Sequence, residues 1–365
     1  MKNVILSMLM STPLIAADLS FYVGTYTKGG ASEGIYHGTL NTETGEAKLL
    51  GLAGKAENPS FVAIHPNRKF LYAVVEDNGG AVGAFAIEKD GTLRKLNTGS
   101  TKHSGNCHVW VDSTGKNALA ASYGSGTIAS LPIKEDGSLG EATAIIQHVG
   151  SGPDKSRQEK PHAHAIYQNG AFVYACDLGT DDVFIYKFDA DKGTLTPHTP
   201  KSGRVPAGGG PRHLAFHPKG GFAYVNSEMT SAVTTFVHDA EKGTLDPVQT
   251  LSTLPEDYAT PKNSSTAEIH CRPDGKFVYV SNRGHDSIAV FAVGADGKLT
   301  KVEIADAKVK VPRGFGISPD GKWLIAAGQS SNDLALHAID AARGKLTFKS
   351  IIGKVGAPVN VEFVK

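Results

Sequence analysis

The segment DAEKGTL at 239–245 contains the short pattern that decides the fold, because this pattern returns seven times along the chain. In each copy a polar turn with Asp, Asn or Glu is followed by Gly and then by Leu. The other copies are TETGEAKL at 42–49, EKDGTL at 88–93, KEDGSL at 134–139, DADKGTL at 189–195, GADGKL at 294–299 and DAARGKL at 340–346. Their glycines are 46 to 56 residues apart. A period in this range, with glycine turns between short apolar runs, is typical of β-propeller blades.

A second repeat runs in phase with the first and predicts how the ring closes. Two apolar runs flank a Pro or polar turn in SFVAIHPNRKFLYAVV at 60–75, and similar hairpins begin near residues 213, 268 and 314, with weaker copies near 108 and 164. The seventh hairpin is divided between APVNVEFVK at 357–365 and DLSFYVGTYT at 18–27. Joining these ends in one blade leaves no free sheet edge. We therefore predict an all-β, seven-bladed propeller over 18–365, closed by its N- and C-terminal strands.

The composition excludes several classes of protein. The 37 Lys and Arg nearly balance the 36 Asp and Glu, so nothing favours nucleic acid or an anionic membrane as a partner. The first 17 residues, MKNVILSMLMSTPLIAA, fall outside the repeat and have the charge, apolar stretch and small residues of a signal peptide. They are too short and interrupted for a transmembrane helix. We expect a periplasmic or secreted protein, with a cytoplasmic one as the alternative, and a monomer or weak oligomer.

The three cysteines, Cys107, Cys176 and Cys271, all fall in predicted inner strands. An odd number at such positions argues against a disulfide framework and favours buried free thiols. The chain also has no P-loop, dinucleotide fingerprint or nucleophile elbow. We therefore expect no cofactor.

Polar residues gather where the innermost strands begin, at one mouth of the predicted central channel. When the hairpins are aligned, three histidines and a glutamate occupy one equivalent position of the repeat, that is, one column of the alignment. Arginines occur in the neighbouring column. The loops that follow the second strands return to the same mouth and add Tyr, Glu and Arg. Core packing does not require such residues, so their convergence favours a functional site. The candidates from this alignment are Tyr26, Glu76, His108, His162, His164, Arg212, His213, Glu228, Glu268, His270, Arg283 and Arg313.

Two other interpretations of these residues remain open. Arg and Glu at the mouth can pair to hold blades together, and a single His is often structural. A metal site could use His162, His164 and Glu268, although their spacing matches no known metal motif, so we predict none.

The chain resembles the lactonase family of seven-bladed propellers, which includes bacterial 6-phosphogluconolactonases and fungal carboxy-cis,cis-muconate cyclases. The resemblance covers about residues 18–365. It is carried by FYVGTYT (21–27), NPSFVAIHPNRKFLYAVVE (58–76), PHAHAI (161–166), GGGPRHLAFHPKGGFAYVNSE (208–228), AEIHCRPDGKFVYVSNRGHDSI (267–288) and PRGFGISPDGKWL (312–324). It implies a catalytic set of His164, Arg212, Glu228 and Arg283. We assign the other candidates from the alignment to substrate binding, with Arg313 as an auxiliary to the two catalytic arginines.

The resemblance implies hydrolysis of a lactone, with a sugar-acid lactone as substrate. Either Glu228 or His164 would be the general base, and Arg212 and Arg283 would stabilise the oxyanion and hold an anionic group. The predicted signal peptide argues against 6-phosphogluconolactone itself, because relatives in cytoplasmic sugar-phosphate metabolism carry none. The alternatives are a cycloisomerase that closes a lactone on a muconate-type carboxylate, a metal-dependent enzyme, and a non-catalytic extracytoplasmic binding propeller.

Overall fold

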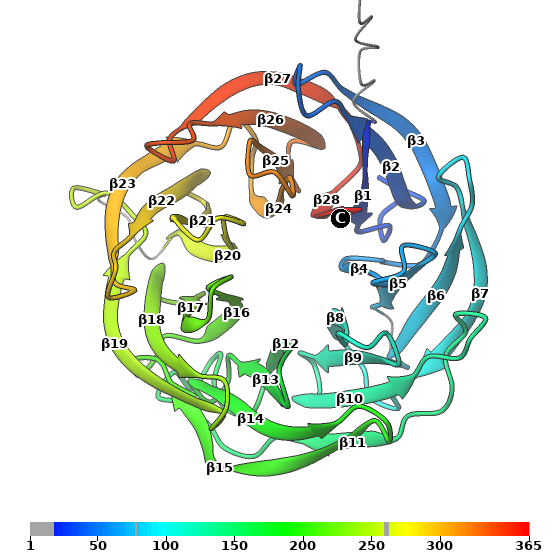
Figure 1. Cartoon of the computed structure of the whole chain (residues 1–365), viewed down its shortest axis with the longest axis vertical. Helices are drawn as coiled ribbons and strands as arrows, with labels where there is room; N and C mark the ends of the chain where they lie inside the picture. Colours follow the sequence, from blue (N-terminus) through cyan, green and yellow to red (C-terminus); the bar gives the residue numbers. More distant parts are fainter. Residues whose placement is uncertain (1–17, 77–78, 259–262, 365) are drawn as a thin grey trace, which may run out of the picture.

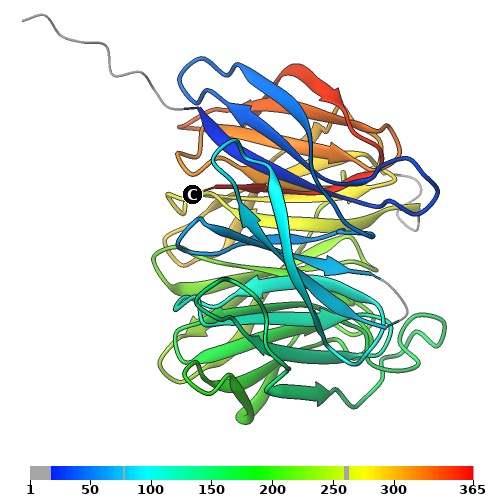
Figure 2. The same ribbon diagram turned by 90° about the vertical axis from the view of Figure 1, so that its right-hand side faces the viewer.

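The computed structural model of the protein describes residues 18–76, 79–258 and 263–364. Within them 28 strands form seven antiparallel sheets of four strands, and no α-helix occurs. Figure 1 shows the sheets as blades around a central axis, with β4, β8, β12, β16, β20, β24 and β28 innermost. Figure 2 shows the same ring edge-on. The predicted seven-bladed propeller is confirmed.

Each blade runs outward from the axis in strand order, and we number the blades along the chain. Blade 1 contains β4 (Val62–Ile64), β5 (Phe70–Val75), β6 (Ala81–Ile87) and β7 (Leu93–Ser100); blade 2 contains β8 (Asn106–Val111), β9 (Asn117–Ser122), β10 (Thr127–Pro132) and β11 (Ala144–Gln147). Blade 3 contains β12 (Ala163–Asn169), β13 (Phe172–Asp177), β14 (Asp182–Asp189) and β15 (Thr194–Arg204); blade 4 contains β16 (Pro211–Phe216), β17 (Gly221–Ser227), β18 (Ala232–Asp239) and β19 (Thr244–Ser252). Blade 5 contains β20 (Ser265–Cys271), β21 (Phe277–Arg283), β22 (Ser287–Val293) and β23 (Leu299–Asp306); blade 6 contains β24 (Pro312–Ile317), β25 (Trp323–Gly328), β26 (Asp333–Ile339) and β27 (Leu346–Lys354).

Blade 7 closes the ring by joining the two ends of the chain. Its innermost strand is the C-terminal β28 (Pro358–Phe363), which pairs with β1 (Leu19–Thr25), followed by β2 (Gly34–Leu40) and β3 (Ala47–Lys55). The pairing is antiparallel, with Phe21 opposite Phe363 and Val23 opposite Val361. The predicted closure by the termini is therefore confirmed. The predicted signal peptide, residues 1–17, lies outside the described residues.

The seven repeated glycines form the turns between the third and fourth strands of the blades. All seven have a positive φ, between 64° and 83°, which explains why glycine recurs there. Most of these turns also press on an aromatic or imidazole ring of the preceding blade, as Gly137 does on Phe70. The Tyr72 hydroxyl donates a hydrogen bond of 2.9 Å to the Gly137 carbonyl, and Tyr22, Tyr224 and Tyr279 repeat this bond in other blades. The turn repeat therefore joins neighbouring blades as well as reversing the chain.

We expect Gly137→Ala to lower the free energy of unfolding by about 1–3 kcal/mol more than the control Gly220→Ala. Both glycines have a positive φ, of 82° and 75°, so both substitutions strain the backbone. An added Cβ at Gly137 would lie 2.2 Å from the Phe70 ring, whereas at Gly220 it would meet nothing within 4 Å. Urea denaturation measures the difference, and equal destabilisation would contradict this role of the turn in blade packing.

The three cysteines are free thiols, as the sequence predicts. Burial raises the pKa of Cys107 and of Cys271 to about 12, and it raises that of Cys176 as well. None is therefore a thiolate near neutral pH. No helix of the described residues is long and apolar enough to cross a membrane.

Candidate active site

A repeated β-bulge places side chains at the axis where the innermost strands begin. In β16, Pro211 pairs with Ser227 and His213 with Asn226, so the ladder skips Arg212. The same register shift occurs in other blades. It leaves Arg313, Cys107, His164 and, in β28, Val359 without a partner residue on the neighbouring strand. Bulges bend a strand and re-aim the extra side chain. Four of these residues, Cys107, Arg212, Arg313 and Val359, line one small cavity, which we call the inner cavity.

The bulge corrects one detail of the sequence alignment. The hairpin alignment puts His164 in one column with His213. The strand register instead makes His164 the bulge residue of blade 3, equivalent to Arg212 and Arg313. A one-residue bulge cannot be located from an apolar pattern alone, because the pattern continues on both sides of it.

Glu228 is the centre of an ion-pair cluster at the same end of the axis. Its Oε2 lies 3.1 Å from Arg212 Nε and 3.0 Å from Arg283 Nη2. Its Oε1 accepts a hydrogen bond of 2.8 Å from Arg157 Nη2. The structure therefore brings three of the four predicted catalytic residues into direct contact.

The charges of this cluster decide its protonation state. Burial by itself raises the pKa of the Glu228 carboxyl, but the three guanidinium groups outweigh burial and lower the pKa to about 2. Burial lowers the pKa of Arg283 to about 10, so it stays charged near neutral pH. Glu228 is thus a carboxylate that holds cations in place, and it is a weak base.

Arg157 is the member of this cluster that the sequence analysis missed. It lies in the loop 148–162, between β11 and β12, outside every column of the hairpin repeat. Its neighbour Gln158 is fully buried and donates hydrogen bonds to Leu178 O and Asp181 Oδ1, which anchors the loop. No periodic signal could have identified Arg157, because its position depends on this tertiary anchor.

A hydrogen-bonded chain runs from Arg212 into the ring. Arg212 Nη1 lies 3.1 Å from His213 Nε2, and His213 Nδ1 lies 2.7 Å from Glu268 Oε1. Because a guanidinium can only donate, His213 Nε2 accepts, and its proton is on Nδ1 facing Glu268. Burial lowers the pKa of His213 well below 6.5, and Arg212 lowers it further. His213, a candidate substrate-binding residue, is therefore a hydrogen-bond partner of Arg212, and Glu268, another candidate, is the partner of His213.

His164 is a neutral imidazole beside this chain. Its ring centroid lies 5.3 Å from that of His213 and 5.6 Å from that of Tyr123. Burial lowers the pKa of His164 well below 6.5, and Arg212 adds to the effect. Its Nδ1 is buried without a hydrogen-bond partner among the described residues. Four other histidines of the described residues, His108, His148, His198 and His238, also have such a nitrogen, so His164 is distinguished by its place beside the arginines.

The remaining predicted histidines occupy packing positions. His108 is fully buried, 4.2 Å from the Phe61 ring and 4.8 Å from the Tyr167 ring; like His164, it lines neither of the two cavities described here. His162 stacks on Tyr123, and the His270 ring packs edge-on against Phe315. Their predicted role in substrate binding stays a prediction.

Arg313 has no carboxylate within 4.0 Å among the described residues. Its guanidinium lies 5.6 Å above the ring of Tyr26, where a cation–π contact holds it in the inner cavity. Its positive charge adds to the electrostatic attraction that the arginines around Glu228 exert on an anion. The arginines outnumber the carboxylates here, so the inner cavity suits a substrate that is, or becomes, negative.

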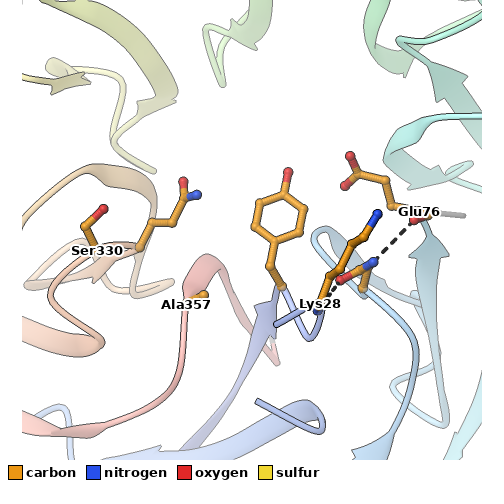
Figure 3. Close-up of a pocket in the computed structure, with 7 residues that line it drawn as sticks. Lys28, Glu76, Ser330 and Ala357 are labelled. Atoms are coloured by element: carbon orange, nitrogen blue, oxygen red, sulfur yellow. Dashed lines mark hydrogen bonds between the residues drawn. The ribbon is translucent and has the colours of Figure 1, made fainter. Parts of the chain in front are cut away.

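A second, larger cavity of about 450 Å³ adjoins the inner one, and Tyr26 lines both. We call it the outer cavity. Figure 3 shows Lys28 and Glu76 on one side of it and Ser330 on the other. It is lined by Tyr26, Lys28, Asn58, Glu76, Gln329, Ser330 and Ala357. Its volume is in the range of small-molecule sites.

No group of three or more His, Cys, Asp or Glu side chains suited to a metal ion occurs in the described part of the chain. The donor set at the mouth is also unsuited to a cation, because guanidinium groups surround Glu228 and His213 is already hydrogen-bonded at both nitrogens. Guanidinium groups can instead polarise a carbonyl and stabilise an oxyanion.

The fold and this site define a seven-bladed β-propeller with a cluster of arginines beside two cavities at one end of its axis. The family described as "Lactonase, 7-bladed beta-propeller" matches residues 20–363. The chain therefore belongs to the lactonase family of seven-bladed propellers.

Relatives and solved structures agree with this family over nearly the whole chain. The 6-phosphogluconolactonase of Bacillus subtilis (strain 168) is 40% identical over 348 residues, which are 94% of this chain and 97% of the relative. The crystal structure of a putative 6-phosphogluconolactonase from Bacteroides fragilis has a TM-score of 0.89 and 37% identity, covering 98% and 100% of the two chains. The periplasmic gluconolactonase of Pseudomonas aeruginosa has a TM-score of 0.88 and 28% identity, covering 96% and 99%.

Proposed function

We propose that this protein is a lactone hydrolase that opens a sugar-acid lactone at this mouth of the channel, with the lactone carbonyl directed towards the inner cavity. The observation that carries the proposal is the group of guanidiniums from Arg212, Arg283 and Arg313 beside the neutral imidazole of His164. Water attacks the lactone carbonyl, the ring C–O bond breaks, and the product is a hydroxy acid that releases one proton. This reaction needs a proton acceptor for water and cations for the oxyanion.

We assign His164 as the general base and Glu228 as the residue that positions the arginines. The low pKa of Glu228 leaves it charged but makes it a poor acceptor of a proton from water. Burial and Arg212 lower the pKa of His164 as well, but His164 is neutral and its unpartnered nitrogen, unlike the Glu228 oxygens, is not held in an ion pair. Arg212 and Arg313 would stabilise the oxyanion, and Arg283 would hold the carboxylate as it forms. Family membership and the relatives named 6-phosphogluconolactonase and gluconolactonase support this chemistry.

The pH dependence of kcat/KM follows from this assignment. A base with a lowered pKa stays unprotonated as the pH falls, so activity should be constant from pH 8 to pH 6.5 and fall only below 6.5. Acid release in a pH-stat, corrected for spontaneous opening, measures the profile. A loss of activity centred at or above pH 6.5 would contradict His164 as the base in this environment.

A panel of substrates tests the reaction class. Purified protein is incubated with aldonolactones and with a muconate, and NMR identifies the products. Opening of an aldonolactone supports the proposal. Closure of muconate alone would favour a cycloisomerase, and no turnover of any compound would favour a binding propeller.

We also propose a periplasmic or secreted location, as for the periplasmic gluconolactonase of Pseudomonas aeruginosa. Mass spectrometry of the protein from its native host tests this, because export should remove about residues 1–17. An intact N-terminus on the cytoplasmic protein would contradict it.

A further inference from the structure

The outer cavity is a preformed pocket with polar groups left unused by the protein. Asn58 Oδ1 accepts hydrogen bonds of 2.9 Å from the backbone nitrogens of Thr27 and Lys28, and Asn58 Nδ2 donates to Glu76 O. These bonds fix two walls against each other, as Figure 3 shows for Lys28 and Glu76. On the other side, the backbone nitrogens of Gln329 and Ser330 donate to Val311 O and Lys310 O. The walls are therefore held by the Asn58 side chain and by backbone contacts, which leaves the side chains of Gln329 and Ser330 for a ligand.

Glu76 is the carboxylate of this pocket. Its Oε2 accepts a hydrogen bond of 2.8 Å from Ser60 Oγ, and no Lys, Arg or His nitrogen of the described residues lies within 4.0 Å of it. The side chains of Tyr26, Gln329 and Ser330 make no hydrogen bond within the described part of the chain. The second oxygen of the Glu76 carboxylate, the Tyr26 hydroxyl, and the Gln329 and Ser330 side chains thus line the pocket without hydrogen bonds among the described residues, which matches a ligand rich in hydroxyl groups, because hydroxyls both donate and accept.

The charge of the pocket argues against an anionic ligand group. A phosphate monoester carries about −1.5 to −2 charges at neutral pH and would face the unpaired carboxylate of Glu76. The cation at the outer cavity is Lys28, which is exposed at its edge and keeps its hydration there. The arginines that could hold a phosphate lie at the inner cavity, where the lactone carbonyl must react.

We propose that the outer cavity binds the hydroxylated, uncharged end of the substrate and that Glu76 makes the protein select unphosphorylated sugar lactones. The proposal rests on the lactonase function. Tyr26 lines both cavities, so a molecule in the outer cavity can direct its carbonyl towards Arg212 and Arg313 while its hydroxyls contact Glu76; the inner cavity itself has room for about one water-sized group. Repulsion from the Glu76 carboxylate disfavours a substrate with a negatively charged substituent at the end far from its lactone carbonyl.

The test compares kcat/KM for D-glucono-1,5-lactone and for its 6-phosphate. The wild-type protein should prefer the unphosphorylated lactone. Glu76→Gln keeps an oxygen for the Ser60 hydrogen bond and should lower kcat/KM for the unphosphorylated lactone about 10- to 100-fold, mainly through KM, because a charge-assisted bond is lost. Its value for the 6-phosphate should stay constant or rise. The matched control Glu57→Gln removes the same charge from an exposed neighbour outside the pocket.

Three results would overturn the proposal. The wild-type protein could prefer the 6-phosphate and lose that preference on Lys28→Met, which would make the pocket a phosphate subsite. Glu76→Gln could lower both kcat/KM values equally, which would give Glu76 a positioning role. Glu57→Gln could match Glu76→Gln, which would indicate a general effect of net charge.

If the protein opens no lactone, the proposed function fails but the pocket is still tested by binding. Calorimetry with D-gluconate and 6-phosphogluconate should then show tighter binding of D-gluconate, and Glu76→Gln should weaken it. Equal affinity for the two acids, or no binding of either, would overturn the assignment of the pocket.

Discussion

Replacing His164 by asparagine is expected to lower kcat for lactone opening by about 10²–10⁴-fold, the usual contribution of general acid–base catalysis. Asparagine keeps a polar side chain of moderate size at the bulge but cannot accept the proton of water. The KM should change little, because in this account the arginines and the outer cavity carry most of the substrate binding. Steady-state kinetics with a blank for spontaneous opening measure both parameters.

The control for this variant is His103→Asn, which changes a half-buried histidine outside both cavities. It should retain wild-type kinetics. Thermal unfolding of each variant separates a catalytic effect from a structural one. A folded His164→Asn protein with near-normal kcat would show that His164 is not the base, and an unfolded one would favour a packing role.

The second large effect is expected from Glu228→Gln. Removing the charge leaves the guanidiniums of Arg157, Arg212 and Arg283 close together without a counter-ion. Loss of one partner of a buried ion pair costs about 3 kcal/mol of unfolding free energy. Because the displaced arginines hold the substrate, kcat/KM should also fall. The control Glu241→Gln removes an exposed charge that has no ion pair among the described residues.

The pH dependence of this destabilisation has a definite sign. The pKa of Glu228 is about 2 in the folded protein, below its ordinary value of 4.5. Its contribution is therefore full above about pH 4.5 and is lost as the pH falls towards 2. The difference in stability between wild type and Glu228→Gln should shrink over this interval. A variant as stable as the wild type, with only kcat reduced, would instead identify Glu228 as the base.

The sequence predicts the ring well because its signals are local and repeated. A turn such as Gly137 needs a positive φ, and the divided hairpin at the termini can be completed in one way, by β28 pairing with β1. It also predicts which residues gather at the mouth, since equivalent strand ends meet there. The residues predicted in this way include Glu228, Arg212 and Arg283, and the structure joins them by ion pairs.

What the sequence could not predict depends on irregular backbone and on protonation. The bulge that makes His164 equivalent to Arg212 leaves no mark in an apolar pattern. Arg157 comes from a loop outside the repeat and is placed by the buried Gln158. The proposal of His164 rather than Glu228 as base rests on the ion pairs that hold the Glu228 carboxylate, and these are visible only in three dimensions.

The central claim is that the cations and the imidazole at the mouth open lactones without a metal ion. The most direct measurement is the rate of acid release from D-glucono-1,5-lactone near neutral pH, with a chelator present, for the wild-type protein and for Arg212→Lys. We predict a rate well above spontaneous opening that the chelator does not change, and a large loss in Arg212→Lys, because lysine cannot reproduce the planar fork of arginine. A wild-type rate equal to spontaneous opening, or activity lost with chelator and restored by zinc or calcium, would contradict the account.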